Sequence, residues 1–169
     1  MSQRVNRTQE KVKKEDTSIH SFISNSKLFS DRPVLFIMDV SGSLWFNFGK
    51  NPYMRRLSSL VISMSNSLQQ KQVKIGGAFV TDQVELFQEP SLNGSLKLEE
   101  TLQTLIPVSK KTDLLNALIK LQAHYKEPSI FVVLSDFKSH FNRLFLRPQI
   151  TKPMLETEHL ILPFILHET

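Results

Sequence analysis

The sequence predicts a doubly wound, Rossmann-like α/β sandwich with a mostly parallel central sheet, one antiparallel edge hairpin strand and helices on both faces. Two observations predict this fold. Continuous apolar runs at 34–38 and 130–134 are typical of parallel strands that are buried on both faces. Segments with apolar residues at helical spacing alternate with the strands, which is how βαβ units build a parallel sheet.

Each element follows from its own local pattern. Asn51 and Pro52 favour a helix start, because Asn caps helices and Pro fits the first turn. Two strands separated by a short turn are expected to form a hairpin, and Pro163 predicts that the last strand lies near an edge or ends there. In chain order we expect a strand at 34–38, a helix at 51–70, strands at 73–80 and 84–87, helices at 96–106 and 113–125, a strand at 130–134, a short helix at 141–145 and a strand at 160–166.

Composition bounds the domain organisation and the chemistry. Residues 1–30 are expected to form a polar, partly flexible N-terminal segment with one short amphipathic helix between Ile19 and Phe29, and residues 31–169 a single domain. There are no cysteines, which excludes disulfides and thiolate chemistry and fits a cytoplasmic setting. No apolar stretch approaches the roughly 18 to 20 residues of a membrane span, so we expect none in this chain.

The net charge is +5, with part of the excess in the N-terminal segment and the rest scattered. This pattern is more typical of a solvated surface than of a nucleic-acid interface. Nucleic-acid binding through the basic N-terminal segment therefore stays a less favoured alternative. It would be recognised by an affinity for DNA or RNA that falls steeply with salt concentration.

Polar side chains gather where the predicted strands end. Asp39 ends the first strand and Asp136 follows the strand at 130–134, so both face one crevice if these strands are neighbours. Ser41 and Ser43 lie in the loop after Asp39, and Thr112 lies in the loop before a helix. Carboxylates and hydroxyls are hard oxygen ligands, which suit Mg²⁺, Mn²⁺ or Ca²⁺.

The segment Asp39-Val-Ser41-Gly-Ser43 resembles the DxSxS motif of von Willebrand factor A and integrin I domains, their metal-ion-dependent adhesion site. In that family a Thr from a middle loop and an Asp after the fourth strand complete the site, and Thr112 and Asp136 stand at those places. The resemblance implies that residues 31–169 form a von Willebrand A-like domain. It also implies a bound cation, Mg²⁺ foremost, whose shell a Glu or Asp of a protein partner completes.

A finer resemblance is to bacterial von Willebrand A proteins encoded beside MoxR ATPases, the domain-of-unknown-function 58 group. Three segments carry it: Phe48-Gly49, Thr112-Asp113-Leu114 and Ser135-Asp136-Phe137. The resemblance points to a MoxR-type AAA+ ATPase, or a complex that it helps to assemble, as the partner. It also points to membrane association through that partner.

Two alternatives concern the same residues. Asp39 and the serines could serve only to cap the loop and helix after the first strand. The aromatic residues Trp45, Phe46 and Phe48 follow the motif directly, so they either pack under the end of the sheet or stay exposed and contact the partner.

An enzymatic alternative is a Mg²⁺-dependent phosphoester hydrolase with Asp39 as ligand or nucleophile. Neither a general base nor a phosphate clamp is evident near the motif, and the histidines lack ligand spacing. A Gly-x-Ser-x-Gly elbow and a phosphate-binding Gly-rich loop are also missing. We therefore expect a metal-dependent binding module and not an enzyme.

Overall fold

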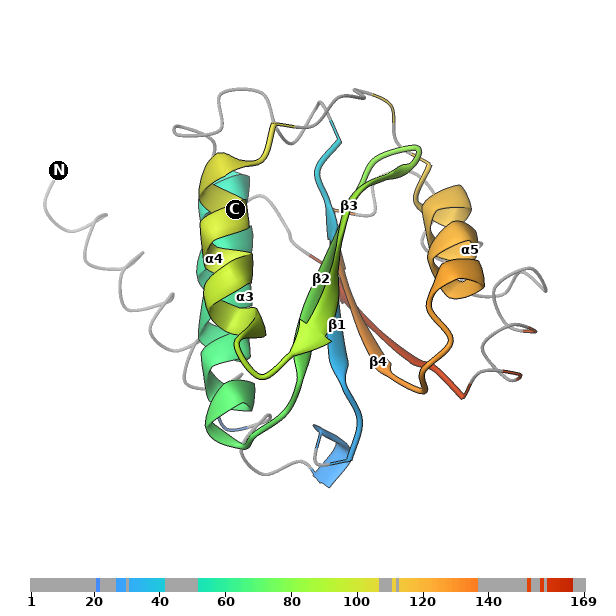
Figure 1. The fold of residues 1–169 in the computed structure, drawn as a ribbon. Helices are drawn as coiled ribbons and strands as arrows, with labels where there is room; N and C mark the ends of the chain where they lie inside the picture. Colours follow the sequence, from blue (N-terminus) through green and yellow to red (C-terminus); the bar gives the residue numbers. More distant parts are fainter. Residues whose placement is uncertain are drawn as a thin grey trace, which may run out of the picture.

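The protein is seen in a computed structural model that describes residues 21, 27–29, 31–41, 52–106, 111, 113–136, 152, 156 and 158–165. Within these ranges five strands form one sheet, in the order β3-β2-β1-β4-β5 (Figure 1). The strands are β1 (Val34–Asp39), β2 (Ile75–Val80), β3 (Val84–Ser91), β4 (Ile130–Ser135) and β5 (Leu160–Ile165). The described helices are η1 (Lys27–Phe29), α3 (Pro52–Gln70), α4 (Gly94–Thr104) and α5 (Leu114–His124).

The sheet is mostly parallel. β1 lies at its centre and pairs in parallel with both β2 and β4, and β4 pairs in parallel with β5. Only the β2–β3 pair is antiparallel, and it forms one edge of the sheet. The predicted fold class is therefore confirmed, including the antiparallel hairpin strand at an edge and the parallel neighbourhood of the two most apolar strands.

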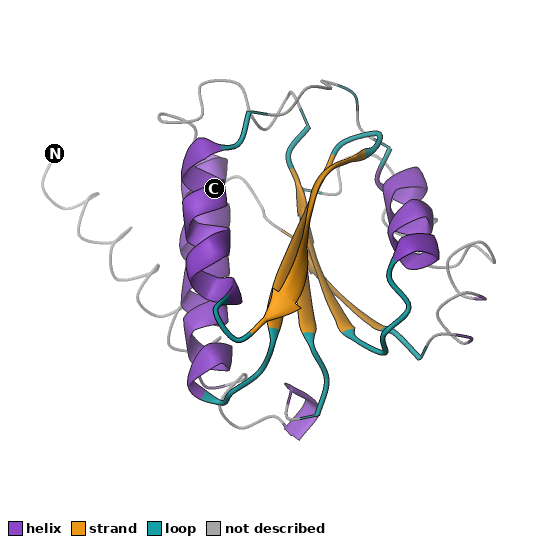
Figure 2. Cartoon of the chain, viewed as in Figure 1, coloured by secondary structure: helices purple, strands orange, loops and turns teal. Residues whose placement is uncertain are grey.

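Helices cover both faces of the sheet: α3 and α4 lie on one face and α5 on the other (Figure 2). Because successive side chains of a strand point to opposite faces of the sheet, β1 packs against the helices on both faces. Val34, Phe36 and Met38 pack in the cluster that contains the buried faces of α3 and α4. Leu35 and Ile37 pack in the cluster that contains α5.

Several element boundaries differ from the prediction. β3 continues to Ser91, beyond the predicted end at 87, because Pro90 lies where the pairing with β2 shifts register between Gln88 and Ser91. α4 covers Gly94–Thr104 where 96–106 was predicted. Its early start depends on Gly94, since a Cβ there would collide with the backbone of Ile75 at the start of β2.

Other boundaries agree to within one or two residues, and some predictions fall on residues that the structure does not describe. β2 begins at Ile75 and not at 73, and α5 is two residues shorter than expected. The predicted helix at 141–145 lies outside the described residues. Of the amphipathic helix predicted between Ile19 and Phe29, Ser21 is helical and Lys27–Phe29 form a 3-10 turn. Among the helices in the described part of the chain, none has the length and apolar character to cross a membrane.

Candidate functional site

The candidate site lies at the carboxyl edge of the sheet, where β1 and β4 end side by side. From β1 the chain passes through α3 to β2 on one side, whereas β4 and β5 lie on the other side. The order of strands therefore reverses between β1 and β4. In doubly wound sheets, ligands bind outside the carboxyl ends of the strands at such a reversal.

Asp39 is the last residue of β1 and its side chain is 2% exposed. The Ser135 hydroxyl donates a hydrogen bond of 2.8 Å to Asp39 Oδ2, and the Ser41 amide donates one of 3.0 Å to Asp39 Oδ1. The first contact follows from strand register. Met38 pairs with Leu134, so the next residues, Asp39 and Ser135, come together at the ends of the two strands.

The surroundings of Asp39 raise the pKa of its carboxyl group. Burial raises its pKa above the ordinary 3.8, against hydrogen bonds from Ser135 and Ser41 that lower it, and the nearby negative charge of Asp136 raises it further. Within the described residues, no Lys or Arg forms an ion pair with Asp39. Burying a carboxylate without a cationic partner is costly.

Asp136 directly follows β4 and is half-buried. It adjoins Ser135, whose hydroxyl bonds to Asp39, and its negative charge contributes to the raised pKa of Asp39. The Ser41 side chain is 1% exposed and also hydrogen bonds to Asp39. The structure thus brings together three of the residues that the sequence predicts as ligands: Asp39, Ser41 and Asp136.

A second set of contacts ties the start of α5 to the same edge. Val40 donates its amide hydrogen to the Val80 carbonyl at 2.9 Å, which holds the ends of β1 and β2 together. The next residue, Thr81, accepts a hydrogen bond of 3.1 Å from the amide of Asp113. The amide of Asp113 therefore lies beside the end of β2.

Side chains at the start of α5 reinforce this connection. Asn116 donates from its side-chain amide to the Asp82 carbonyl at 2.9 Å. The Asp113 carboxylate caps the helix by accepting from the Asn116 amide at 3.0 Å. The turn between β2 and β3 and the first turn of α5 therefore form one hydrogen-bonded unit.

Five predicted site residues lie outside the described part of the chain. They are the candidate ligands Ser43 and Thr112 and the candidate partner contacts Trp45, Phe46 and Phe48. Ser135 and Thr81 also contribute to the site, and neither contribution was predicted from the sequence. Their positions at strand ends were visible in the sequence, but the register that makes Ser135 a partner of Asp39 was not.

The donor chemistry of the described residues fits a hard divalent cation. Asp39 Oδ2 accepts from the Ser135 hydroxyl and Asp39 Oδ1 accepts from the Ser41 amide, and carboxylate oxygens have further lone pairs that a metal or its waters can use. The described residues contain no group of three or more His, Cys, Asp or Glu side chains suited to a metal. A site here would therefore use carboxylates together with neutral hydroxyls, as Mg²⁺ tolerates when it keeps several waters.

The chain is thus a doubly wound α/β protein with a buried carboxylate at its topological switch point. A family model described as "Protein of unknown function DUF58" matches residues 14–154, which is most of the chain. The chain belongs to this family.

One solved structure with a similar fold is the crystal structure of an aerotolerance-related membrane protein from Bacteroides fragilis NCTC 9343 with multiple mutations to serines. The TM-score is 0.60 at 12% sequence identity, and the match covers 80% of this chain and 67% of that chain. At this identity the likeness shows a shared fold. A search of curated proteins found no match.

Proposed function

We propose that the chain is a von Willebrand A-type module that binds a protein partner through a divalent cation, Mg²⁺ foremost. The proposed ligands, direct or through water, are Asp39, Ser41, Ser43, Thr112 and Asp136. One observation carries the proposal: Asp39 and Asp136 come together at the ends of two adjacent parallel strands, at the point where ligands bind in this fold class.

The charges of the site favour adhesion over catalysis. The two carboxylates balance the charge of a divalent cation, so the local net charge is near zero. The hydroxyl ligands occupy coordination positions and add no charge. A Glu or Asp of the partner can then replace a water on the metal. A hydrolase would need one group to activate that water and another to stabilise the leaving oxygen. Of the histidines that the structure describes, both His124 and His159 lie toward the amino edge of the sheet.

The proposed partner is a MoxR-type AAA+ ATPase or a complex that it helps to assemble, and membership of the DUF58 family supports this choice by resemblance. Trp45, Phe46 and Phe48 are proposed to contact the partner beside the metal. We place the module in the cytoplasm, with attachment to a membrane through the partner.

The experiment measures binding of the full chain to a MoxR-type ATPase in Mg²⁺, in EDTA and after Mg²⁺ is restored. We expect binding to be lost in EDTA, to return with Mg²⁺, and to weaken in Thr112→Ala. The matched control is Thr104→Ala, at the exposed end of α4, where the hydroxyl only bonds to the Glu100 carbonyl. Hydrolysis of p-nitrophenyl phosphate should be absent.

Two outcomes would overturn the proposal. One is partner binding that is indifferent to EDTA. The other is metal-dependent phosphatase activity that disappears in Asp39→Ala.

A further inference from the structure

The first turn of α5 is bonded to the turn between β2 and β3, on the face of the sheet opposite α3 and α4 (Figure 1). The Asn116 side-chain amide donates to the Asp82 carbonyl at 2.9 Å, and the Asp113 backbone amide donates to the Thr81 carbonyl at 3.1 Å. The backbone amide of Asn116 also donates to the Asp113 carboxylate at 3.0 Å. Asn116 therefore links the cap of the helix to the turn between the two strands.

The turn between β2 and β3 is itself hydrogen-bonded and adjoins the end of β1. Thr81 is 1% exposed, and its hydroxyl donates to the Glu85 carboxylate at 2.8 Å. Directly before it, the Val80 carbonyl accepts from the amide of Val40 at 2.9 Å, and Val40 is the residue after Asp39. Backbone hydrogen bonds therefore connect the end of β1, through the end of β2, to the start of α5.

Asp113 also adjoins a proposed ligand, because Thr112 directly precedes it in the chain. Adjacent α-carbons are about 3.8 Å apart across a trans peptide bond, so the contacts that hold Asp113 limit the positions open to its neighbour. A ligand that is held in place before the cation binds loses less conformational freedom on binding, and the affinity is higher for that reason.

We propose that Asn116 is a positioning residue for the metal site. Its hydrogen bond to the Asp82 carbonyl holds the start of α5 beside the end of β2, and so holds Thr112 where the cation can use its hydroxyl. The inference rests on the proposed function, in which Thr112 is a ligand. Asn116 acts on the cation only through Thr112 and does not bind it.

A purely structural role for Asn116 is the alternative, and a second hydrogen bond of the same kind separates the two roles. The Gln88 side-chain amide donates to the Gly94 carbonyl at 3.1 Å and so ties β3 to the start of α4. Gly94 lies against Ile75 at the beginning of β2, which is at the amino edge of the sheet. Both bonds join a side-chain amide to a backbone carbonyl at the start of a helix, but only that of Asn116 lies near the proposed metal site.

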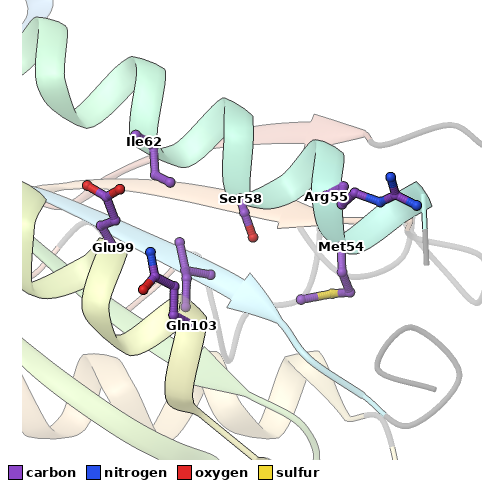
Figure 3. Close-up of a pocket in the computed structure, with 7 residues that line it drawn as sticks. Met54, Arg55, Ser58, Ile62, Glu99 and Gln103 are labelled. Carbon is purple, nitrogen blue, oxygen red and sulfur yellow. The ribbon is translucent and has the colours of Figure 1, made fainter. Parts of the chain in front are cut away.

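The test measures Mn²⁺ affinity by calorimetry and the free energy of unfolding by urea denaturation, both on the full chain. Asn116→Ala should weaken Mn²⁺ binding by about tenfold or more, since loss of a residue that orients a ligand costs about 10- to 100-fold. Gln88→Ala should lower stability to a similar extent and leave Mn²⁺ affinity unchanged. Gln103→Ala should change neither property, because its exposed side chain lines a groove between α3 and α4, on the other face of the sheet (Figure 3).

Two further variants make the test independent of one substitution. Asn116→Leu is similar in size to the wild type but has no donor, and it should weaken Mn²⁺ binding as Asn116→Ala does. The double variant with Thr112→Ala then tests whether Asn116 acts through Thr112. Once Thr112→Ala has removed the ligand, Asn116→Ala should weaken Mn²⁺ binding by less than about twofold further, because substitutions that act through one contact are not additive.

The outcomes separate this inference from the proposed function. Wild-type Mn²⁺ affinity in folded Asn116→Ala or Asn116→Leu overturns the inference and leaves the proposed function standing. Equal losses of affinity in Asn116→Ala and Gln88→Ala overturn it as well, since the effect would then follow stability alone. Losses from Asn116→Ala and Thr112→Ala that add in full show that Asn116 does not act through Thr112, and they overturn it too. A wild-type chain that does not bind Mn²⁺ overturns the proposed function, and the inference fails with it.

Discussion

The two ends of the sheet are built from different kinds of contact. At the amino edge, Arg32 bonds to the Glu158 carbonyl and lies 3.9 Å from the Glu158 carboxylate. The His159 ring stacks on Phe131 at a centroid distance of 4.4 Å and bonds through Nε2 to the Tyr125 carbonyl at 3.1 Å. Ring packing, hydrogen bonds and the contact between Arg32 and Glu158 therefore hold this edge together.

The carboxyl edge places a carboxylate in a similarly buried position without a matching cation. Asp39 receives hydrogen bonds from Ser135 and Ser41, but within the described residues it forms no ion pair. Such a group costs stability unless a ligand compensates for it. If the proposed function is right, substitutions at the amino edge should change stability and substitutions at the carboxyl edge should change metal binding.

The largest effect on stability is expected at the amino edge, from Phe131→Ala. Phe131 is fully buried in the cluster under α5 and carries the stacked ring of His159. Its truncation should lower the free energy of unfolding by about 3 to 5 kcal/mol, measured by urea denaturation. Mn²⁺ affinity should stay unchanged at temperatures where the variant is folded. A large loss of metal affinity in the folded variant would contradict the division between the two ends.

The largest effect on binding is expected from Asp39→Asn. Loss of a direct ligand should reduce Mn²⁺ affinity by more than the roughly 10- to 100-fold that loss of an outer partner costs. In EDTA, the variant should be as stable as the wild type or more stable, because the amide removes a buried charge but can still accept from Ser41. Calorimetric titration and thermal unfolding measure the two properties.

The control for this substitution is Asp31→Asn, just before β1 at the opposite end, where the side chain is exposed. It should change neither Mn²⁺ affinity nor stability by a measurable amount. An Asp39→Asn protein with unaltered Mn²⁺ affinity would remove Asp39 from the site.

A smaller effect is expected from the same substitution made at both ends of β4. Ser135→Ala removes the 2.8 Å hydrogen bond to Asp39 and should weaken Mn²⁺ binding about 10- to 100-fold, as loss of a residue that orients a ligand does. Ser129→Ala removes a 2.7 Å hydrogen bond to the Glu127 carbonyl. It should cost about 1 kcal/mol of stability and leave Mn²⁺ affinity unchanged. Equal Mn²⁺ affinities for the two variants would refute an orienting role for Ser135.

The sequence predicted the strands of this fold better than the contacts at their ends. Apolar runs define β1 and β4 because strands buried on both faces carry no polar positions, and both were located to within one residue. The extension of β3 through Pro90 was missed, since Pro interrupts most strands, whereas here it lies where the pairing with β2 shifts register. The start of α4 depends on the close approach of Gly94 to β2, which is a tertiary contact.

The candidate site shows the same limit. The sequence placed Asp39 and Asp136 at strand ends, and the parallel pairing of β1 with β4 confirmed that these ends are neighbours. It did not identify Ser135 as the residue that bonds to Asp39, because that contact depends on the register between strands nearly a hundred residues apart in the chain. Nor did it show that Asp113 is tied to Thr81.

The smallest effect concerns the response of the amino edge to acid. Burial lowers the pKa of His159 below its ordinary 6.5, against a hydrogen bond to the Tyr125 carbonyl that raises it, and the charges of Lys126 and Arg32 lower it further. In the unfolded chain this histidine takes up its proton near pH 6.5, whereas in the folded chain it does so at lower pH. The unfolded state therefore binds more protons in that interval, so stability is full above pH 6.5 and falls as the pH decreases through the interval.

His159→Gln should remove this contribution, because glutamine does not titrate. We expect the free energy of unfolding to fall less steeply below pH 6.5 in the variant than in the wild type. Urea denaturation at a series of pH values measures both slopes. All other titrating groups are common to the two proteins, so the difference between the slopes reports His159. Lys126→Gln should give an intermediate slope, since it removes one of the charges that lower the pKa of His159. Identical slopes in the wild type and His159→Gln would show that protonation of His159 does not change the free energy of unfolding. The pKa of His159 would then be the same in the folded and unfolded chain.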